Sequence, residues 1–255
     1  MSNNSCDTCP VHHESNLIKL GIDMSQYDLV IALAGNPNTG KSTVFNSLTG
    51  LKQHTGNWPG KTVTRAEGAF KFGENNYKIV DLPGTYSLLS TSTDEQVARD
   101  FILFGQPDVT VVVVDATRLE RNLNLALQIL EITDRVVLCL NLMDEAKRHN
   151  IEIDVRSLSR ELGVPVVPTI ARSKEGMQEL LAKIEEVATG KFLCKPKRIK
   201  FKDKDLSKAV ENIAKKLKES FPDLQNEKWV AMRLLEGDES ITKSLEQGML
   251  GHLSL

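Results

Sequence analysis

The segment that most constrains the fold of this chain is GNPNTGKS, which runs from Gly35 to Ser42. It fits the pattern G-x4-G-K-[S/T], and it lies between an apolar, β-rich run at 29–34 and a segment with helical spacing at 43–51. Glycines between a strand and a helix let backbone N–H groups turn inward around phosphate oxygens, and the helix directs its positive end at the same anion. The sequence therefore predicts a phosphate-binding loop, or P-loop. Its expected members are Gly35, Asn36, Pro37, Asn38, Thr39, Gly40, Lys41, Ser42 and Thr43.

Three side chains give this loop a metal-dependent chemistry. Lys41 is predicted to place its positive charge on the β- and γ-phosphates, and the hydroxyl of Ser42 can ligate Mg²⁺. Asp81 ends a later predicted strand in the sequence DLPG, where a carboxylate that faces the P-loop can hold Mg²⁺ through water. The backbone N–H of Gly84 can then sense a γ-phosphate. D-x-x-G alone is more often a simple turn, and its position after a P-loop is what favours the metal interpretation.

The sequence NLMD, from Asn141 to Asp144, follows the apolar run at 136–140 and points to a guanine base. An aspartate carboxylate accepts two hydrogen bonds, from N1–H and from the N2 amino group of guanine, and adenine lacks this pair of donors. Alone, N-x-x-D is more often a helix cap. In this order after the two earlier motifs, it predicts recognition of guanine by Asn141, Met143 and Asp144.

The net charge and the apolar pattern exclude some classes of protein. The 255 residues include 32 Lys and Arg against 34 Asp and Glu, for a net charge of −2, so a broadly basic surface for nucleic acid is not expected. No apolar run approaches the roughly 18 residues that cross a bilayer, and the N-terminus lacks the pattern of a signal peptide. Four scattered cysteines favour a reducing, cytosolic environment over a disulfide scaffold.

The order of elements predicts an α/β fold and three regions. Residues 1–26 are expected to be a flexible extension, 27–190 a nucleotide-binding domain, and 191–255 a Lys-rich linker followed by a small all-helical part. Strands alternating with helices imply a mostly parallel, six-stranded sheet with helices on both faces, and 62–80 is expected to add an antiparallel hairpin. The strands are expected at 29–34, 62–72, 77–80, 109–114, 136–140 and 164–167. The helices are expected at 43–51, 94–104, 119–131, 154–162, 176–189, 204–219, 226–236 and 238–250.

The motifs together resemble known GTPases. Their order is similar to the translation-factor-related class of small GTPases, and TIAR at 169–172 takes the place of that class's fifth motif, in which the N–H of Ala171 meets the guanine oxygen beside Thr169. GNPNTGKSTVFNSLTG, GNWPGKTV, DLPGTYSL, VDATRLERNL and NLMDEA resemble the GTPase domain of the ferrous iron transport protein B (FeoB) family. KWVAMRLLEGD at 228–238 is similar to that family's helical spacer, so the resemblance covers about 27–250.

This resemblance implies a fold and a setting. The fold would be a P-loop small-GTPase domain with an all-α C-terminal subdomain, which hydrolyses GTP to GDP and phosphate. In the family this part lies at the cytoplasmic face of the cell membrane and precedes a membrane region that moves Fe²⁺. The expected partners are guanine nucleotide, that membrane region of the same polypeptide, a second copy of the chain and small accessory proteins, with no nucleic acid.

The resemblance also implies residue roles. Thr62 would complete the Mg²⁺ shell with Ser42 and Asp81 in the GTP state, although Thr64 competes for this role. Asn36 would help to hold K⁺ beside the phosphates, with the backbone carbonyls of two further residues. These further ligands are Gly56 and Trp58. Catalysis would rest on Lys41, Thr62 and Gly84, and GTP would order the loops at 52–64 (switch I) and 84–93 (switch II).

Two departures from common GTPase motifs predict slow hydrolysis and rapid exchange. Thr85 stands where many GTPases have the water-orienting glutamine, and threonine is too short for the same reach. Leu142 replaces the lysine of N-K-x-D and removes a cationic stem from over the base, so weaker nucleotide binding is expected. Two alternatives stay open: a soluble GTPase of ribosome assembly or tRNA modification, and a nucleotide-gated binding module with negligible turnover.

The cysteines and one tryptophan remain outside these motifs. Cys6, Cys9, His12 and His13 could supply Zn²⁺ or Fe²⁺ ligands, but a mobile tail is the favoured interpretation. Cys139 on a core strand is expected to be a small buried hydrophobe. Trp229 is expected in the core of the helical part.

Overall fold

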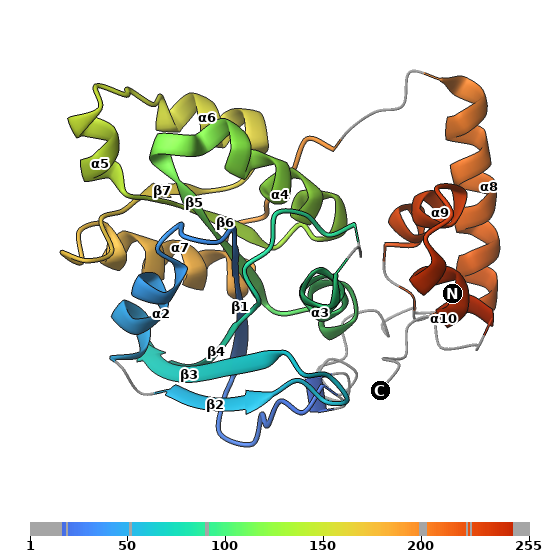
Figure 1. Ribbon diagram of the computed structural model, residues 1–255, viewed down its shortest axis with the longest axis horizontal. Helices are drawn as coiled ribbons and strands as arrows, with labels where there is room; N and C mark the ends of the chain where they lie inside the picture. Colours follow the sequence, from blue (N-terminus) through green and yellow to red (C-terminus); the bar gives the residue numbers. More distant parts are fainter. Residues whose placement is uncertain are drawn as a thin grey trace.

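A seven-stranded sheet, in the order β2-β3-β4-β1-β5-β6-β7, organises the larger part of the molecule (Figure 1). The computed structural model describes residues 17–18, 20–50, 53–89, 92–198, 203–222, 224 and 226–246. The strands are β1 Leu29–Gly35, β2 Gln53–Asn57, β3 Thr64–Phe72, β4 Asn75–Asp81, β5 Val109–Asp115, β6 Val136–Asn141 and β7 Val166–Pro168.

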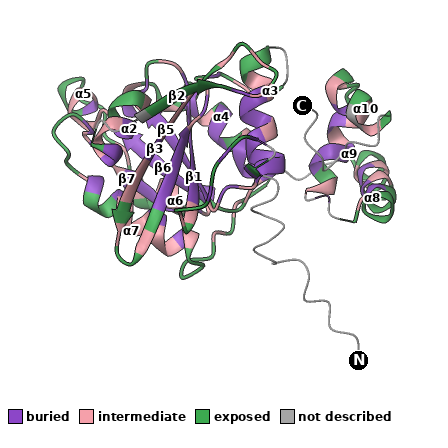
Figure 2. Cartoon of the chain, turned by 90° about the horizontal axis from the view of Figure 1, so that it is seen from below, coloured by how far each residue is buried: buried purple, intermediate pink, exposed green. Residues whose placement is uncertain are grey.

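The central strands confirm the predicted mostly parallel sheet. β4, β1, β5, β6 and β7 run parallel, and β3 pairs antiparallel with β4 as the expected hairpin. β5 and β6 are continuous apolar runs whose residues are all buried, because helices cover both faces of the sheet (Figure 2). The carboxyl ends of the parallel strands lie at one edge of the sheet. The P-loop begins there at the end of β1, and the NLMD sequence begins there at the end of β6.

The sheet has one strand more than the six that the sequence predicts. β2 lies inside the expected switch I loop and pairs antiparallel with β3, with Gln53 opposite Gly68 and Asn57 opposite Thr64. Its sequence QHTGN has no apolar alternation, and residues 54–57 are exposed. An edge strand with no buried face leaves no periodic signal, so the pattern that finds the other strands does not find this one.

Alternate residues of the strands face two helical layers. Ile31 and Leu33 of β1 pack with α2 (Lys41–Thr49) and α7 (Met177–Ala188) on one face. Val30 and Ala32 face the other layer. That layer contains α3 (Thr93–Asp100), the π-helix η1 (Phe101–Gly105), α4 (Leu119–Ile132) and α6 (Val155–Leu162). The sequence predicts α3 and η1 as one helix, and it does not predict α5 (Met143–Arg148) or the short 3-10 helix at Ala116–Arg118.

Three further helices form a separate group beside α3, at the end of the molecule away from α5 (Figures 1 and 2). They are α8 (Lys204–Ser220), α9 (Glu227–Leu235) and α10 (Glu239–Glu246), close to the predicted ranges. Val210, Ala214 and Leu217 form the buried stripe of α8, and Trp229 of α9 is only 7% exposed. The prediction that Trp229 belongs to the core of this helical part is confirmed.

The described part of the N-terminal region differs from the prediction of a flexible extension over 1–26. Leu17, Leu20, Ile22 and Met24 are buried in the same apolar cluster as α3 and α4, so the prediction is wrong for the described residues from 17 to 26. Leu20, Ile22 and Met24 alternate as residues of a strand do, but the run is short and no strand forms there, so periodicity does not reveal this packing. Cys6, Cys9, His12 and His13 lie outside the described residues.

Two further findings concern the chain as far as it is described. Cys139 is fully buried, as predicted, and burial raises the pKa of its thiol to about 12, against a smaller opposing effect of the hydrogen bond with Thr169. Within the described ranges, no helix combines the length and the apolar character needed to cross a bilayer.

Candidate nucleotide-binding site

The P-loop leaves the end of β1 and closes on the first turn of α2. Thr39 Oγ1 donates to the carbonyl of Asn36 at 2.9 Å, which fixes the loop from inside. Gly40, at φ 81°, precedes the helix and has no side chain to cap it. The first N–H groups of α2 are therefore left for an anion, as the motif predicts.

Close packing explains why two positions of the loop are glycine. A Cβ on Gly35 would lie 2.6 Å from the carbonyl oxygen of Val113 on β5. A Cβ on Gly40 would collide with the amide nitrogen of Asn141. The P-loop backbone therefore lies directly against the two strands β5 and β6 that end beside it, and a larger residue at either position would displace it.

Asn141 joins three loops, a role that sequence reasoning misses. Its Nδ2 donates to the carbonyl of Thr39 in the P-loop at 3.0 Å. Its Oδ1 accepts from the backbone N–H of Ala171 at 3.1 Å and from Thr169 Oγ1 at 3.3 Å. The side chain is 1% exposed, so each bond is made away from water. Asn141, Thr169 and Ala171 are thus brought together as predicted. They form a structural brace, in which the side-chain oxygen of Asn141 accepts from the Ala171 N–H that the sequence expects to meet guanine.

Asp144 lies in the first turn of α5, two residues after Leu142, which takes a left-handed conformation at φ 62°. Arg172 Nη2 is 2.6 Å from Asp144 Oδ2, and Arg148 Nη2 is 3.5 Å from the same oxygen. The carboxylate is therefore a half-exposed acceptor held by two exposed arginines, and neither contact is evident from the motif. Met143 donates its backbone N–H to the Thr169 carbonyl at 3.3 Å.

Lys41 and Asp81, predicted to contact phosphate and metal, form an ion pair with each other. Register explains the contact, because Asp81 on β4 lies opposite Leu33 of β1, near the start of the P-loop. Burial raises the pKa of Asp81, and the charge of Lys41 opposes that shift. Ser42, the next residue of α2, is exposed. The two groups expected to handle phosphate and Mg²⁺ therefore neutralise each other here.

Asn36 is the unpaired polar group of the P-loop. It is 2% exposed, and neither Oδ1 nor Nδ2 has a hydrogen-bond partner among the described residues. A buried polar group without a partner costs about 1–3 kcal/mol, so the amide is poised for a ligand. Its carbonyl oxygen is chemically suited to an alkali cation, which agrees with the predicted K⁺ role.

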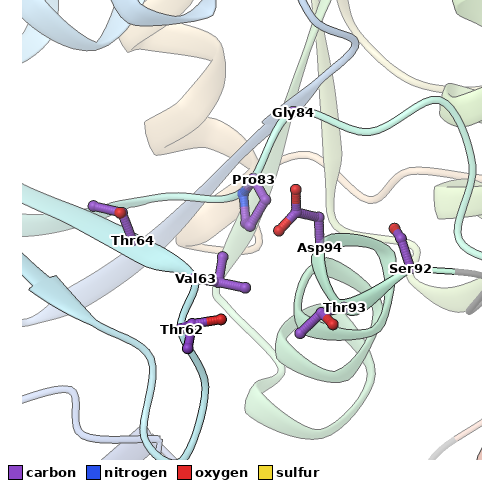
Figure 3. A pocket seen from close by; sticks show the side chains of 8 residues that line it. All are labelled: Thr62, Val63, Thr64, Pro83, Gly84, Ser92, Thr93 and Asp94. Atoms are coloured by element: carbon purple, nitrogen blue, oxygen red, sulfur yellow. The ribbon is translucent and has the colours of Figure 1, made fainter.

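Two cavities lie near the switch segments and the P-loop, and of these two only the second is lined by P-loop residues. One, of about 600 Å³, lies between the turn at 62–64, Pro83–Gly84 and the start of α3; Figure 3 shows Thr62 and Val63 across from Pro83. The other, of about 410 Å³, separates the P-loop from the segment 115–122. Its lining residues include Asn36, Pro37, Asn38, Thr39, Tyr86, Asp115, Thr117, Arg118, Arg121, Leu142 and Glu145. The first cavity brings Thr62, Thr64 and Gly84 together, and the second shows that the sequence VDATRLERN contributes to the site.

The predicted potassium ligands of switch I lie within β2 and the turn that follows it. Gly56 pairs with Arg65 across the strands, and the carbonyl of Trp58 accepts from the N–H of Lys61 at 3.0 Å. The indole of Trp58 is 3% exposed and packs edge-on against Phe101 of η1. The structure therefore holds Gly56 and Trp58 in contacts within and beside switch I, and it brings only Asn36 of the three predicted ligands into the P-loop.

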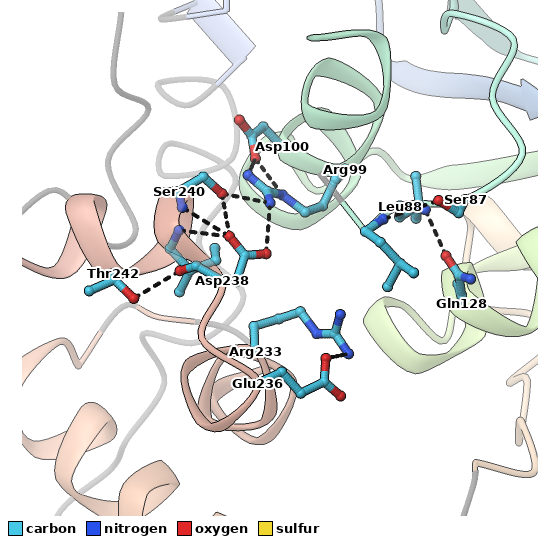
Figure 4. Close-up of polar contacts among 12 residues, drawn as sticks. Ser87, Leu88, Arg99, Asp100, Gln128, Arg233, Glu236, Asp238, Ser240 and Thr242 are labelled. Carbon is cyan, nitrogen blue, oxygen red and sulfur yellow. Dashed lines mark hydrogen bonds and ion pairs between the residues drawn. The ribbon is translucent and has the colours of Figure 1, made fainter. Parts of the chain in front are cut away.

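Switch II leads into the contact with the helical part (Figure 4). Arg99 of α3, 3% exposed, donates through Nη1 to Ser240 Oγ at 3.0 Å and lies 3.4 Å from Asp238 Oδ2. Its Nη2 pairs with Asp100 at 2.7 Å. Burial raises the pKa of Asp100, against the opposing charge of Arg99. A single buried guanidinium therefore joins the helix after switch II to the turn between α9 and α10.

Comparison with known proteins agrees with this geometry. The model of the family described as "Ferrous iron transport protein B" matches residues 29–184, and that of the "FeoB cytosolic helical domain" matches 203–252. The chain belongs to the ferrous iron transport protein B family. Relatives named Fe(2+) transporter FeoB from Escherichia coli K12 and Shigella flexneri are 41% identical over 214 residues.

Solved structures of the family resemble the whole described architecture. The cytosolic domain of Legionella pneumophila FeoB superposes with a TM-score of 0.77 at 34% identity, over 87% of each chain. The cytosolic domain of Thermotoga maritima FeoB in a GDP form gives 0.77 at 35% identity, over 89% of this chain and 88% of that one. The match to the E. coli relative includes 82% of this chain, which spans only 27% of that relative's length. The predicted P-loop GTPase fold with a helical C-terminal part is therefore confirmed.

Proposed function

We propose that this chain is the GTP-binding and GTP-hydrolysing cytoplasmic part of a membrane transporter for ferrous iron, with slow intrinsic hydrolysis stimulated by K⁺. The observation that carries the proposal is the brace at Asn141, which ties the P-loop to both segments expected to meet the guanine base. Its relatives are named Fe(2+) transporters, and the T. maritima structure is a GDP form. The regions 27–190 and 191–255 would be the GTPase domain and the linker with its helical spacer.

Binding of a nucleotide would begin with exchange of the ion pair between Lys41 and Asp81. Lys41 would turn to the β- and γ-phosphates, where the N–H groups of α2 already point. Asp81, released from Lys41, would accept hydrogen bonds from metal-bound water, while the hydroxyls of Ser42 and Thr62 would be direct ligands. Mg²⁺, when bound, supplies positive charge against the phosphate oxygens.

The base would be held by Asp144. For guanine to donate to this carboxylate, the contact with Arg172 must be shared or broken; the arginine is 70% exposed at its side chain and is free to move. The absence of a lysine at Leu142 leaves the base less covered, which supports easy exchange.

Hydrolysis would depend on the unpaired amide of Asn36 and on Gly84 across from it. A Cβ on Gly84 would lie 3.5 Å from Pro37, so the backbone after Asp81 passes close to the P-loop. Asn36, together with the carbonyls of Gly56 and Trp58 once switch I has moved, would hold K⁺, which would supply the charge that an arginine finger supplies elsewhere. The hydroxyl of Thr85 lies on a buried side chain, so the attacking water would be oriented mainly by backbone groups of the switches.

The nucleotide state would reach the helical part through α3. Release of switch II at 84–93 moves the first turn of α3, and Arg99 in that helix holds Asp238 and Ser240. Coupling to Fe²⁺ movement would continue from these helices to a membrane region of the full-length polypeptide.

A phosphate-release assay with full-length chain in KCl and in NaCl tests the hydrolysis. We expect a faster rate in KCl that Asn36→Ala abolishes while GDP affinity changes little. Rates equal to buffer in both salts would favour a binding module without turnover.

An exchange of base specificity tests the guanine site. In Asp144→Asn the side-chain NH₂ can donate to the 2-carbonyl of xanthine. Against guanine the same NH₂ faces the 2-amino group, which is also a donor, so no hydrogen bond forms. We expect affinity for GTP to fall about 100-fold or more and affinity for XTP to rise, since a mispaired buried donor costs several kcal/mol. Equal binding of ATP and GTP by the unaltered chain would contradict the proposal.

A further inference from the structure

The described residues 17–18 and 20–28, here called the strap, lie across the sheet face that carries α3 and η1 and precede the region matched by the family model. Leu17, Leu20 and Ile22 are at most 7% exposed. Leu20 fills the space left by a missing side chain, because a Cβ on Gly105 of η1 would lie 2.8 Å from Leu20 Cδ1. The strap is therefore packed against the layer that contains Phe101 and Trp58.

Two cations from the sheet hold the strap by its backbone. Arg65 of β3 donates to the carbonyls of Leu20 at 2.7 Å and Gly21 at 3.0 Å, and Lys78 of β4 donates to the carbonyl of Asp23 at 3.2 Å. Glu67 pairs with both, at 2.7 Å to Arg65 Nε and 2.6 Å to Lys78 Nζ. All three side chains are 11–13% exposed. The single carboxylate of Glu67 cannot accept from every N–H of the two buried cations. The remaining N–H donors bond to the carbonyls of the strap.

Arg65 also holds switch I. Its guanidinium carbon lies 5.3 Å from the centre of the Trp58 ring, within cation–π range. Gly21 brings the strap against both, since a Cβ there would lie 3.1 Å from Arg65 Nη1 and 3.3 Å from Pro59 Cγ, at a φ of +74°. The strap, Arg65 and the turn at Trp58–Pro59 therefore form one packed unit.

This unit opposes the movement that the proposed function requires. Gly56 is paired with Arg65 in the ladder between β2 and β3, and the Trp58 carbonyl accepts from Lys61, so under the proposed function both contacts would have to change for these carbonyls to hold an ion at Asn36. Arg65 stabilises the present arrangement from both sides, since it belongs to β3, opposite Gly56, and stacks on Trp58. If the strap only covered apolar surface, its buried leucines would be enough. The hydrogen bonds to its carbonyls also fix the strap and the two cations relative to each other.

We propose that Arg65 is a positioning residue that holds switch I away from the P-loop, with the strap as the support that fixes its guanidinium. The strap thereby sets how much K⁺ is needed to draw switch I to the nucleotide. The inference rests on the proposed function, because it names a control on the same GTPase site.

The test compares the full chain with Arg65→Gln and with Gly21→Ala, which pushes the strap away from the Arg65 guanidinium and alters no residue of the sheet. Arg135→Gln is the matched control, because Arg135 makes a single 3.5 Å ion pair with Asp108 on the same domain. Phosphate release is measured against KCl concentration. In both test variants the half-activating K⁺ concentration should fall about tenfold, the size expected for one charge-assisted hydrogen bond, with GDP affinity unchanged. Arg65→Lys, which keeps the charge but not the paired donors, should lie between.

Tryptophan fluorescence gives a readout that does not require turnover. With Trp58→Phe as the spectral blank for Trp229, quenching by acrylamide should be low for Trp58 in the nucleotide-free parent. It should rise when Mg²⁺, K⁺ and a non-hydrolysable GTP analogue are added, and Arg65→Gln should show the high value without nucleotide.

Two results would overturn the proposal. One is a loss of thermal stability in Arg65→Gln and Gly21→Ala with unchanged K⁺ dependence and unchanged Trp58 quenching, which would make the strap a cover only. The other is Trp58 quenching that stays low in the parent with the analogue bound. Failure of the parent to bind GDP would instead reject the proposed function.

Discussion

The base side and the switch side of the site are held together in different ways. On the base side, Asn141 makes three buried hydrogen bonds that join the P-loop to the segments at 141–144 and 169–172. On the switch side, the cavity between Thr62 and Gly84 is open, and β2 of switch I is an edge strand whose residues 54–57 are exposed. The difference teaches that recognition of the base can be rigid while the groups expected to sense the γ-phosphate lie on segments that can be repositioned.

The largest expected effect comes from removing the positive charge of Lys41, which lies between the two sides of the site. Lys41→Ala takes away the predicted phosphate contact and leaves Asp81 without its partner. We expect GDP affinity to fall about 100-fold or more, because charge-assisted contacts to phosphate are among the strongest available. Titration calorimetry measures the loss, and Lys147→Ala, at an exposed residue of α5, is the control. Affinity within threefold of the parent would contradict the site.

A second test removes the brace from the base side. Asn141→Ala leaves the Thr39 carbonyl and the Ala171 N–H without their partner. The free energy of unfolding should fall by about 2–4 kcal/mol, since several buried polar groups lose hydrogen bonds. Urea unfolding of the nucleotide-free chain gives the value. A change below 0.5 kcal/mol, about the size of an ordinary surface substitution, would show that the base side is not held by this amide.

A third test sharpens the description of the switch side. Thr62→Ala should lower the rate of GTP hydrolysis about tenfold with GDP affinity and unfolding free energy unchanged, because its hydroxyl acts only when GTP orders switch I. Thr64→Ala is the matched control, since Thr64 is exposed on the same cavity. If Thr64→Ala has the larger effect, the roles of the two threonines are reversed.

The smallest expected effect concerns the reactivity of Cys139, whose thiol contacts Thr169 on the base side. Burial raises the pKa of its thiol to about 12, so stability from the neutral thiol is fully present below its ordinary pKa of 9.0 and is lost as pH rises from there through about 12. Iodoacetamide at pH 8 should leave Cys139 unmodified in the native chain and alkylate it in urea. Mass spectrometry of peptides distinguishes the four cysteines. Rapid native labelling would mean that the base side opens.

Sequence reasoning predicts most of this fold because its strands are long apolar runs and its loops carry dense motifs. It does not predict β2, whose sequence QHTGN has no apolar alternation and whose residues 54–57 are exposed. It also misses the burial of Leu17, Leu20, Ile22 and Met24, whose partners lie far away in the chain. It brings Asn141, Thr169 and Ala171 to one site, but it cannot tell that the asparagine braces the loops. That distinction depends on which atoms meet, and motif spacing does not record it.

The contact between Lys41 and Asp81 has a consequence for the lifetime of the empty protein. When product leaves, the ammonium and the carboxylate become each other's counterions, so the vacated loop is not left with two bare, poorly hydrated charges. Under the proposed function, emptying the pocket would therefore be less unfavourable than for an isolated lysine, and nucleotide could be reloaded without help from another protein. Occupancy of such a site would follow the ratio of GTP to GDP directly, as a gauge of energy supply.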